Sequence, residues 1–524
     1  MNDLERAKAH FNEGLQRFSI NDFSGAEQSF RAANGLVPGR VSVLSNLATA
    51  LLKQGLLAEA EEWARQALSV DASNFEALLC LGGCAEKCGQ WDASLEHYRR
   101  ALALRPGAPE ALSNIGIVLT RLERHAEALE CLDQAIAASP RLADAWINRG
   151  TVLNNMGQSE AALASLGEAL QLRPDSVEAW HNRGNALANL ARNAEAIQSY
   201  DKVLAIAPDH VEAHFNKSLM LLNTWEFAKG WQEYAWRWQS PTSGAHRYPT
   251  PLPPWNGAAM SGRLLVWAEQ GVGDEILYSS MLAEARAMVG GLIVLIDRRL
   301  LPLFQRSFAD IEFLPKDLPL APDIADRQIS AGSLAGFLRT GRTSFSSAKE
   351  GFLRADSART RQFRSIFGAS SLCGIAWLSK NPRFGDAKSL QLKALLPVLT
   401  TPGLQCVDLQ YGDTLAERAG LLKNEGALLH HLDDLDTFND LDGLAALIDA
   451  CDVVVTTSNL TVHIAGALGK PTHLLVPFSR GKIWYWHAGD QQSLWYPSVT
   501  LHRQGADGDW TAAIRSLASG LSPA

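Results

Sequence analysis

Two stretches of the chain, ALSNIGIVLTRLERHAEALECLDQAIAASP (residues 111–140) and AWINRGTVLNNMGQSEAALASLGEALQLRP (residues 145–174), carry one pattern at a spacing of 34 residues. Each has a Gly near its start, an Ala near its middle and a Pro at its end. The same grid extends over most of residues 1–239. Its members are the glycines Gly14, Gly82, Gly116, Gly150 and Gly184, the alanines Ala26, Ala60, Ala128, Ala162 and Ala196, and the prolines Pro38, Pro106, Pro140, Pro174 and Pro208. A fixed period of this length predicts stacked helical repeats.

Each period predicts one helical hairpin. The small residues let its two helices approach, Phe30, Tyr98 and Tyr200 fill the space between them, and the Pro ends the second helix. The pattern resembles the tetratricopeptide repeat, which implies an α-solenoid. We expect residues 1–239 to form this superhelix, with six full repeats and a degenerate seventh that caps the next domain.

One column of the repeats consists of asparagines two positions before the Gly. Its members are Asn12, Asn46, Asn114, Asn148, Asn182 and Asn216, with Cys80 as the break. An Asn amide can donate and accept, so it can bind the backbone of an extended peptide without reading its sequence. The column resembles the asparagine ladder of the eukaryotic O-GlcNAc transferase, which implies a polypeptide acceptor. The alternative is that these amides bridge neighbouring repeats or solvate the groove.

Composition excludes several classes of protein. The 524 residues suit two or three domains, and a net charge of -8 speaks against nucleic acid or anionic membrane as a partner. We see no apolar run long enough for a membrane span and no signal peptide, so we expect a cytoplasmic protein. The seven cysteines show neither disulfide nor metal spacing, and we expect reduced thiols.

The pattern changes after a Pro- and Gly-rich stretch at residues 240–260, which reads as a linker. Short apolar runs then alternate with amphipathic stretches, which predicts parallel strands joined by helices. The runs are RLLVWAE (263–269), GLIVLID (291–297), CGIAWLS (373–379), LQCVDLQ (404–410), VVVTTS (453–458) and HLLVP (473–477). We expect an α + α/β protein whose α/β part has two Rossmann-like halves, residues 261–368 and 369–524, with ligands at the carboxyl ends of the strands.

Three motifs suggest a family. They are EQGVGDEI (269–276), GIAWLSKNPRFGDAKSLQL (374–392) and TTSNLTVHIAGALGKPTHLLVP (456–477). Together with the repeats they resemble bacterial proteins that carry tetratricopeptide repeats before a GT-B, heptosyltransferase-like glycosyltransferase domain. More narrowly, they resemble the repeat-containing flagellin glycosyltransferases. The resemblance implies that residues 261–368 face the acceptor and residues 369–524 bind the nucleotide.

The first motif suggests a catalytic acid–base group. Gly271 and Gly273 form a tight turn that opens a helix, whose free N–H groups point at a ligand above the sheet. In the family, the acid after this turn is the general base, which implies that Asp274 deprotonates the acceptor hydroxyl. Glu275 is a second candidate, or only a charge that stabilises the helix N-terminus.

The third motif predicts the donor site. Its residues Thr457, Ser458, Asn459, Thr461 and His463 surround a helix N-terminus that suits a phosphate. Many heptosyltransferase-like proteins have an Asp here where this chain has Ser458 or Asn459, which speaks against a heptose donor. The alternative is a polar cap on a buried helix.

Basic residues supply the remaining site candidates. Lys380 and Lys388 could stabilise the leaving phosphate and Arg383 could bind it, although a solvated loop is the alternative. Arg480 and Lys482 would suit a donor with its own carboxylate. The aromatic residues from Trp484 to Tyr496 could stack on a sugar or close a domain interface. The acids around Asp434 and Asp436 read as a solvated loop, so we predict no metal site.

We therefore expect a metal-independent protein O-glycosyltransferase with no cofactor other than its nucleotide-sugar substrate. The resemblance points to flagellin as acceptor, and the cationic pair Arg480 and Lys482 favours a CMP-nonulosonic acid as donor. Two alternatives stay open: a transferase acting on a lipopolysaccharide-type glycan, and a non-catalytic repeat scaffold with a decayed transferase domain.

Overall fold

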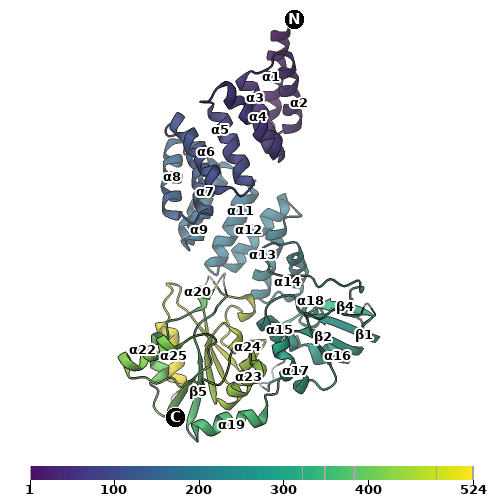
Figure 1. Cartoon of the computed structure of the whole chain (residues 1–524), viewed down its shortest axis with the longest axis vertical. Coiled ribbons are helices and arrows are strands. Elements are labelled where there is room, and N and C mark those ends of the chain that lie inside the picture. Colours follow the sequence, from purple (N-terminus) through teal and green to yellow (C-terminus); the bar gives the residue numbers. More distant parts are fainter. Residues whose placement is uncertain (1, 322, 347–349, 382–384, 479–480, 522–524) are drawn as a thin grey trace. The chain divides into compact units, whose positions relative to one another are not determined.

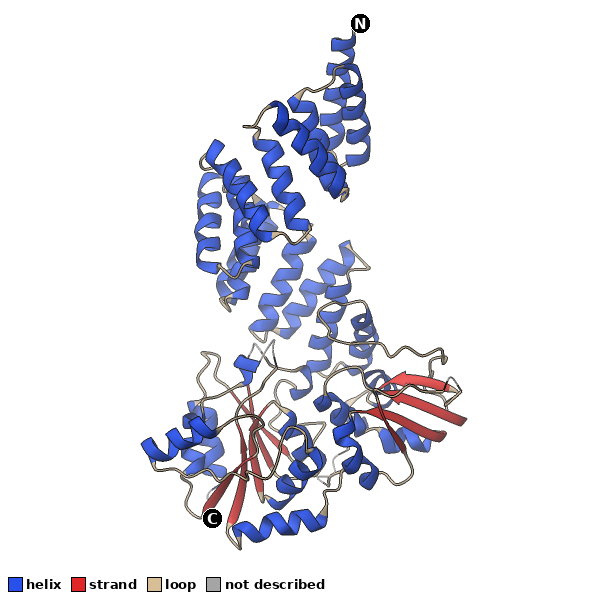
Figure 2. Ribbon diagram, in the orientation of Figure 1, coloured by secondary structure: helices blue, strands red, loops and turns tan. Residues whose placement is uncertain are grey.

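The computed structural model describes residues 2–321, 323–346, 350–381, 385–478 and 481–521. The chain divides into two compact units, Met1–Ala186 and Leu187–Ala524. Figure 1 labels the elements of both units, and Figure 2 shows that the strands form two separate groups after an all-helical region. No helix in the described part of the chain is both long and apolar enough to cross a bilayer.

The first unit is a series of helical hairpins, as the 34-residue period predicts. Its helices are α1 (Asp3–Ser19), α2 (Phe23–Leu36), α3 (Val41–Gln54), α4 (Leu57–Val70), α5 (Phe75–Lys87), α6 (Trp91–Leu104), α7 (Pro109–Arg121), α8 (His125–Ala138), α9 (Ala143–Asn155), α10 (Ser159–Leu172) and most of α11 (Val177–Asn189). Successive helices pack in pairs. The second helix of each Pro-containing repeat ends two residues before its Pro, as at Leu36 and Pro38.

The small residues of the repeat grid allow close packing within each hairpin. A Cβ on Gly14 would lie 2.5 Å from Cε1 of Phe30, and one on Gly82 would lie 2.4 Å from Cε1 of Tyr98. Leu132 takes the aromatic position against Gly116. The prediction that glycine and a large side chain meet in each hairpin is confirmed at these positions.

The second unit begins with the last repeats and continues into the α/β region. Its first helices are α12 (Asn193–Ile206), α13 (Val211–Asn223), α14 (Phe227–Tyr234) and the 3-10 helix η1 (Ala235–Trp238). Trp231 and Tyr234 belong to the same hydrophobic core as the strands that follow. The Trp231 indole donates to the Arg339 carbonyl at 2.8 Å, and the Asn223 amide donates to the Trp484 carbonyl at 3.2 Å. The seventh helical pair therefore packs on the α/β region.

The first sheet is parallel, with the strand order β3-β2-β1-β4. Its strands are β1 (Met260–Trp267), β2 (Val289–Ile296), β3 (Glu312–Pro315) and β4 (Arg327–Ser330). The connecting helices are α15 (Val272–Ser279), α16 (Leu282–Ala287), the 3-10 helix η2 (Arg298–Leu300), α17 (Leu301–Ser307) and α18 (Ala331–Leu338). β3 and β4 are absent from the predicted strands because each has only four residues and no continuous apolar run.

The predicted linker covers one face of this sheet. Tyr248 and Leu252 pack in one cluster with Leu265 and Trp267, while the alternate β1 residues Leu264 and Val266 belong to the main core. The backbone N–H of Trp255 donates to the Gln328 carbonyl on β4 at 2.8 Å. The stretch is irregular but packed, because alternate apolar residues of β1 and β2 need cover on this face.

The second sheet is also parallel, with the order β6-β5-β7-β8-β9. Its strands are β5 (Ser371–Ala376), β6 (Leu404–Asp408), β7 (Val453–Thr457), β8 (Thr472–Val476) and β9 (Val499–Arg503). Its main helices are α20 (Gly385–Lys388), α21 (Leu396–Leu399), α22 (Leu415–Glu425), α23 (Leu441–Ala450), α24 (Leu460–Ala467) and α25 (Thr511–Leu521), with the 3-10 helix η5 (Trp484–Trp486). All six predicted strands are confirmed, and β9 is an additional edge strand.

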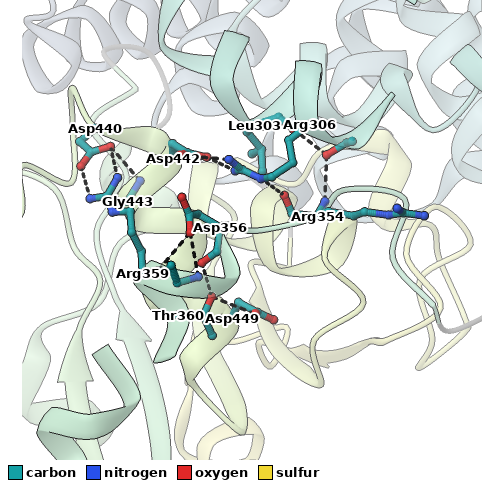
Figure 3. A network of polar contacts seen from close by, with 12 residues as sticks. Leu303, Arg306, Arg354, Asp356, Arg359, Thr360, Asp440, Asp442, Gly443 and Asp449 are labelled. Carbon is teal, nitrogen blue, oxygen red and sulfur yellow. Dashed lines mark hydrogen bonds and ion pairs between the residues drawn. The ribbon is translucent and has the colours of Figure 1, made fainter. Parts of the chain in front are cut away.

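A polar network joins the regions around the two sheets (Figure 3). Arg306 on α17 pairs with Asp442 on α23 and donates to the Arg354 carbonyl at 2.9 Å. On α19 (Ser357–Phe367), Arg359 pairs with Asp440 at 2.5 Å. The network ties α17 and α19 to α23, so the first sheet has a fixed connection to the second on this side.

Candidate functional site

The strand orders define a switch point in each sheet, which is where open parallel sheets bind ligands. In the first sheet it lies between β1 and β4, and in the second between β5 and β7. α15 follows β1 and α24 follows β7, and these two helices pack against each other. A Cβ on Gly273 would lie 2.9 Å from Cδ2 of His463, so this Gly permits the contact. The predicted base motif and the predicted donor motif therefore meet.

Asp274 lies half-buried in the first turn of α15. Burial and, after it, the nearby charge of Glu269 raise its pKa to about 7, and Lys388 opposes the shift. A carboxylate that titrates near neutral pH is suited to accept a proton and release it again. Among the residues predicted from sequence, Asp274 has the electrostatic setting of an acid–base group.

Among the described residues, Lys388 is a cation whose charge favours the ionised form of this carboxylate. It is only 5% exposed, and burial lowers its pKa to about 8 while Asp274 holds it up. Within the described residues, no carboxylate lies within 4.0 Å of its ammonium. A buried cation without a close carboxylate is available to stabilise the charge of a bound anion.

His463 has both ring nitrogens occupied. Its Nδ1 lies 3.1 Å from the Tyr496 hydroxyl, and its Nε2 lies 3.4 Å from the Tyr485 hydroxyl. Burial, with the charge of Lys388, lowers the pKa of His463 to about 3, so the imidazole is neutral. It joins α24 to Gly273 and to the two tyrosines, and a direct contact with a donor would require these bonds to change.

In the hydroxyl-rich turn after β7, some polar side chains already form hydrogen bonds within the protein and others do not. Asn459 accepts from the Thr461 N–H at 2.9 Å and donates to the Leu378 carbonyl at 3.1 Å, so it caps α24. Ser458 accepts from the Trp486 indole at 2.8 Å. These two residues fit the alternative of a polar helix cap. The hydroxyls of Thr457 and Thr461 are buried and have no hydrogen-bond partner among the described residues.

Glu275 is held away from the acid–base position. Its two carboxylate oxygens accept from the Lys316 ammonium and from the Asp297 backbone N–H, each at 2.7 Å. Only 5% of the residue is exposed. This arrangement ties α15 to the ends of β2 and β3, so a structural role accounts for Glu275.

The other predicted cations are dispersed. Lys380 is exposed, and its ammonium lies 5.7 Å from the centre of the Tyr411 ring. Burial lowers the pKa of Lys482 to about 8, with a contribution from the positive charge of Arg503. Arg383 and Arg480 lie outside the described residues. Of the predicted cations that the structure describes, Lys388 is the one whose charge acts on Asp274.

The aromatic loop near the C-terminus closes a core. Trp484, Tyr485, Trp486, Trp495 and Tyr496 are all buried. The ring centres of Trp484 and Trp231 are 5.4 Å apart, in an edge-to-face arrangement. The structure therefore supports the interface alternative for this loop, and no sugar-stacking surface is needed to explain its composition.

Sequence reasoning missed one charged pair beside the site. Arg237 on η1 and Glu269 after β1 form a buried ion pair at 2.9 Å. The sequence signal was weak: a single Arg within the aromatic run WQEYAWRWQ, and an acid directly after an apolar strand. Their separation of 32 positions follows no periodic pattern that would connect the two.

Comparison with known proteins agrees with the repeat pattern. Models of the tetratricopeptide repeat family match residues 40–70, 73–141, 107–175 and 147–211. The N-terminal region is a tetratricopeptide repeat array. Protein FlbA of Caulobacter vibrioides is 31% identical over 314 residues, which is 56% of this chain and 52% of that protein. The chain thus spans about half the length of this relative.

Solved structures give weaker likenesses. The Cut9–Hcn1 complex is 19% identical with a TM-score of 0.40, and covers 41% of this chain and 43% of its own. A tetratricopeptide repeat protein from Parabacteroides merdae is 19% identical with a TM-score of 0.36, covering 44% and 91%. YrrB, titled a repeat protein with an unusual peptide-binding site, is 24% identical with a TM-score of 0.27, covering 35% and 95%.

The asparagine column of the tetratricopeptide array has local partners in several repeats. Asn148 donates to the Ser113 hydroxyl at 3.0 Å, and Asn182 donates to the Thr151 hydroxyl at 2.9 Å. Each of these bonds reaches the preceding repeat, which supports the bridging alternative at the two positions. Asn46 donates within its own helix, Asn12 is exposed, and Asn114 and Asn216 are half-buried.

Proposed function

We propose that the chain is a GT-B glycosyltransferase that moves a sugar from a nucleotide donor to Ser or Thr of a polypeptide bound by the repeats. The observation that carries the proposal is that Asp274, with a pKa near 7, lies where α15 meets α24, and that the charge of the buried Lys388 acts on it. A base and a phosphate-stabilising cation are the two groups that metal-independent transfer requires.

Asp274 and Lys388 would have complementary roles in this reaction. The acceptor oxygen attacks the anomeric carbon, its proton passes to the Asp274 carboxylate, and the bond between that carbon and the phosphate oxygen breaks. The nucleotide leaves with the electron pair, and Lys388 stabilises its growing negative charge. Since Asp274 must be ionised and Lys388 protonated, the rate rises through a pH of about 7 and falls above about 8.

The donor would lie against the turn after β7. The hydroxyls of Thr457 and Thr461 are polar groups that a donor phosphate can satisfy after a small movement, and the α24 N-terminus favours an anion. Lys482 is half-buried and has no carboxylate within 4.0 Å in the described chain, which suits a donor that carries its own carboxylate. A CMP-nonulosonic acid has this chemistry, and we propose it as the donor.

The acceptor would be a polypeptide, and flagellin is our specific proposal, based on the sequence resemblance. A tetratricopeptide array suits an extended chain because its helices present a long groove. The exposed Asn12 and the half-buried Asn114 are the column members best placed to bind a peptide backbone, since Asn148 and Asn182 already donate to neighbouring repeats.

Thermal unfolding with nucleotides tests the donor proposal. The full chain is heated with UDP, CMP, ADP or GDP, and a ligand at 100 times its Kd adds about 2.7 kcal/mol to stability. We expect the largest rise in Tm with CMP, and a smaller rise in the Lys482→Met variant. A rise with ADP alone would instead favour a heptose donor and a glycan acceptor, and no rise with any nucleotide would favour a non-catalytic scaffold.

A further inference from the structure

The last repeat contributes one side chain to the interior of the first sheet's switch point. Arg237 is 2% exposed, and its guanidinium donates to both carboxylate oxygens of Glu269 at 3.0 and 2.9 Å. It also donates to the hydroxyls of Ser330 and Ser333 at 3.1 and 2.7 Å, where β4 ends and α18 begins. Arg237 therefore lies between the carboxyl ends of β1 and β4, in the crevice where such sheets hold ligands.

Two aromatic rings and a glycine lie next to this ion pair. The guanidinium carbon lies 4.1 Å from the Trp238 ring centre and 4.5 Å from that of Tyr234. A Cβ on Gly332 would lie 2.1 Å from Oε1 of Glu269, so only Gly leaves room for the carboxylate. Two aromatic rings thus lie beside the guanidinium, and a Gly leaves room for the carboxylate.

Stability alone is a poor explanation for such a pair. Burying two charges costs several kcal/mol per ion in desolvation, and replacing a buried ion pair by apolar residues is often neutral or stabilising. The sequence position of Glu269 suggests another explanation. It stands five residues before Asp274, at the start of the turn that carries the base.

We propose that the Arg237–Glu269 ion pair is a positioning element of the active site, through which the last tetratricopeptide repeat holds the β1–α15 turn and keeps a negative charge beside Asp274. This inference rests on the proposed function, because it assigns a task to the pair only if Asp274 is the base. It also means that the last repeat is part of the catalytic unit and not only of the acceptor groove.

Several charged or titratable groups face Asp274, and the effect of Glu269 must be judged among them. Glu269 and Glu275 oppose its ionisation, and Lys388 favours it. Buried tyrosine hydroxyls also interact with its charge, from Tyr234 on α14, Tyr278 on α15, and Tyr485 and Tyr496 in the C-terminal loop, and the neutral His463 packs against Gly273. After burial, Glu269 is the largest influence on the pKa of Asp274.

The test is Glu269→Gln, which keeps the shape and removes the charge. We expect the acid limb of the pH–rate profile to move down by about one pH unit, since a like charge no longer opposes ionisation. If the single variant folds poorly, the double variant Arg237→Met with Glu269→Gln replaces it, because it leaves no buried charge unpaired. We expect the acid limb of its pH–rate profile to move in the same direction. Glu312→Gln is the matched control, because its carboxylate pairs with Arg263 on the exposed surface of the same sheet.

A second readout does not depend on transferase activity. The free energy of unfolding is measured by urea titration from pH 5 to 8. The proteins compared are the wild type, Glu269→Gln, Asp274→Asn, and the double variant Arg237→Met with Glu269→Gln. We expect the pH dependence due to Asp274 to shrink when Glu269 is neutral. Equal pH dependence with and without the Glu269 charge would overturn the inference. If that coupling is present but no donor is turned over, the transferase assignment fails and the electrostatic link stands.

Discussion

Asp274 combines two properties that rarely occur together on a half-buried carboxyl group. It lies at a helix N-terminus, which favours the charged form, and yet its pKa is raised because burial and Glu269 act more strongly. The helix position was visible in the sequence. Glu269 was visible too, but its influence on Asp274 depends on the turn geometry, and its partner Arg237 comes from the end of the last helical repeat.

The first prediction concerns pH and stability. The pKa of Asp274 rises from 3.8 to about 7 on folding, so the folded state keeps a proton that the unfolded state releases between these values. The free energy of unfolding should therefore fall as pH rises from about 4 to 7, by at most about 4 kcal/mol from this group. Asp274→Asn should flatten that slope in urea titrations. Asp317→Asn serves as control, since a nearby Arg lowers the pKa of Asp317 and the sign is opposite.

The second prediction separates function from stability at Lys388. Lys388→Met removes a buried charge that has no close carboxylate, so Tm should stay the same or rise. The rate of sugar transfer should fall about 10²–10³-fold, as for other losses of a group that stabilises transition-state charge. Lys393→Met, which removes an exposed partner of Glu425, should leave the rate unchanged. A loss of Tm with full activity in Lys388→Met would show that the residue is structural.

At the scale of elements, the repeat hairpins provide a direct test of close packing. Gly82→Ala places a Cβ 2.4 Å from the Tyr98 ring, and overpacking of this kind should cost about 1–3 kcal/mol of stability. Gly35→Ala on the exposed side of α2 meets nothing within 4 Å and should gain about 0.5 kcal/mol. Urea unfolding of the two variants measures both values. Equal effects would mean that the hairpin contact is loose in solution.

Sequence periodicity predicted the elements that have strong internal patterns. The 34-residue grid predicted seven helical pairs, and six apolar runs of five to seven residues predicted six strands. It did not predict β3 and β4, which have four residues each, or the packing of Tyr248 and Leu252 on the sheet. Those features depend on neighbours far away in the chain. For the same reason, the sequence did not decide between peptide binding and bridging of neighbouring repeats for Asn148 and Asn182. The hydrogen bonds of these residues to Ser113 and Thr151 correspond to the bridging alternative.

At the scale of the whole molecule, the boundary between compact units lies inside the repeat array and not at its end. Residues from Leu187 belong with the α/β region, where Trp231, Asn223 and Arg237 contact it.

A fragment of residues 176–524 should unfold cooperatively and remain monodisperse. A fragment of residues 240–524 should aggregate, because it exposes the core around Trp484. Size-exclusion chromatography measures the aggregation of the two fragments, and urea titration measures the cooperativity of their unfolding. If both fragments are monodisperse and unfold cooperatively, the last repeats are dispensable for this fold.

The most direct measurement is intact-mass spectrometry of purified flagellin incubated with the full chain and a CMP-nonulosonic acid. We expect flagellin to gain whole multiples of the sugar mass on Ser or Thr. Under the same conditions the Asp274→Asn variant should leave the mass unchanged, although it still binds CMP. No mass gain with the wild-type chain, or an equal gain with Asp274→Asn, would contradict transfer by Asp274 acting as base.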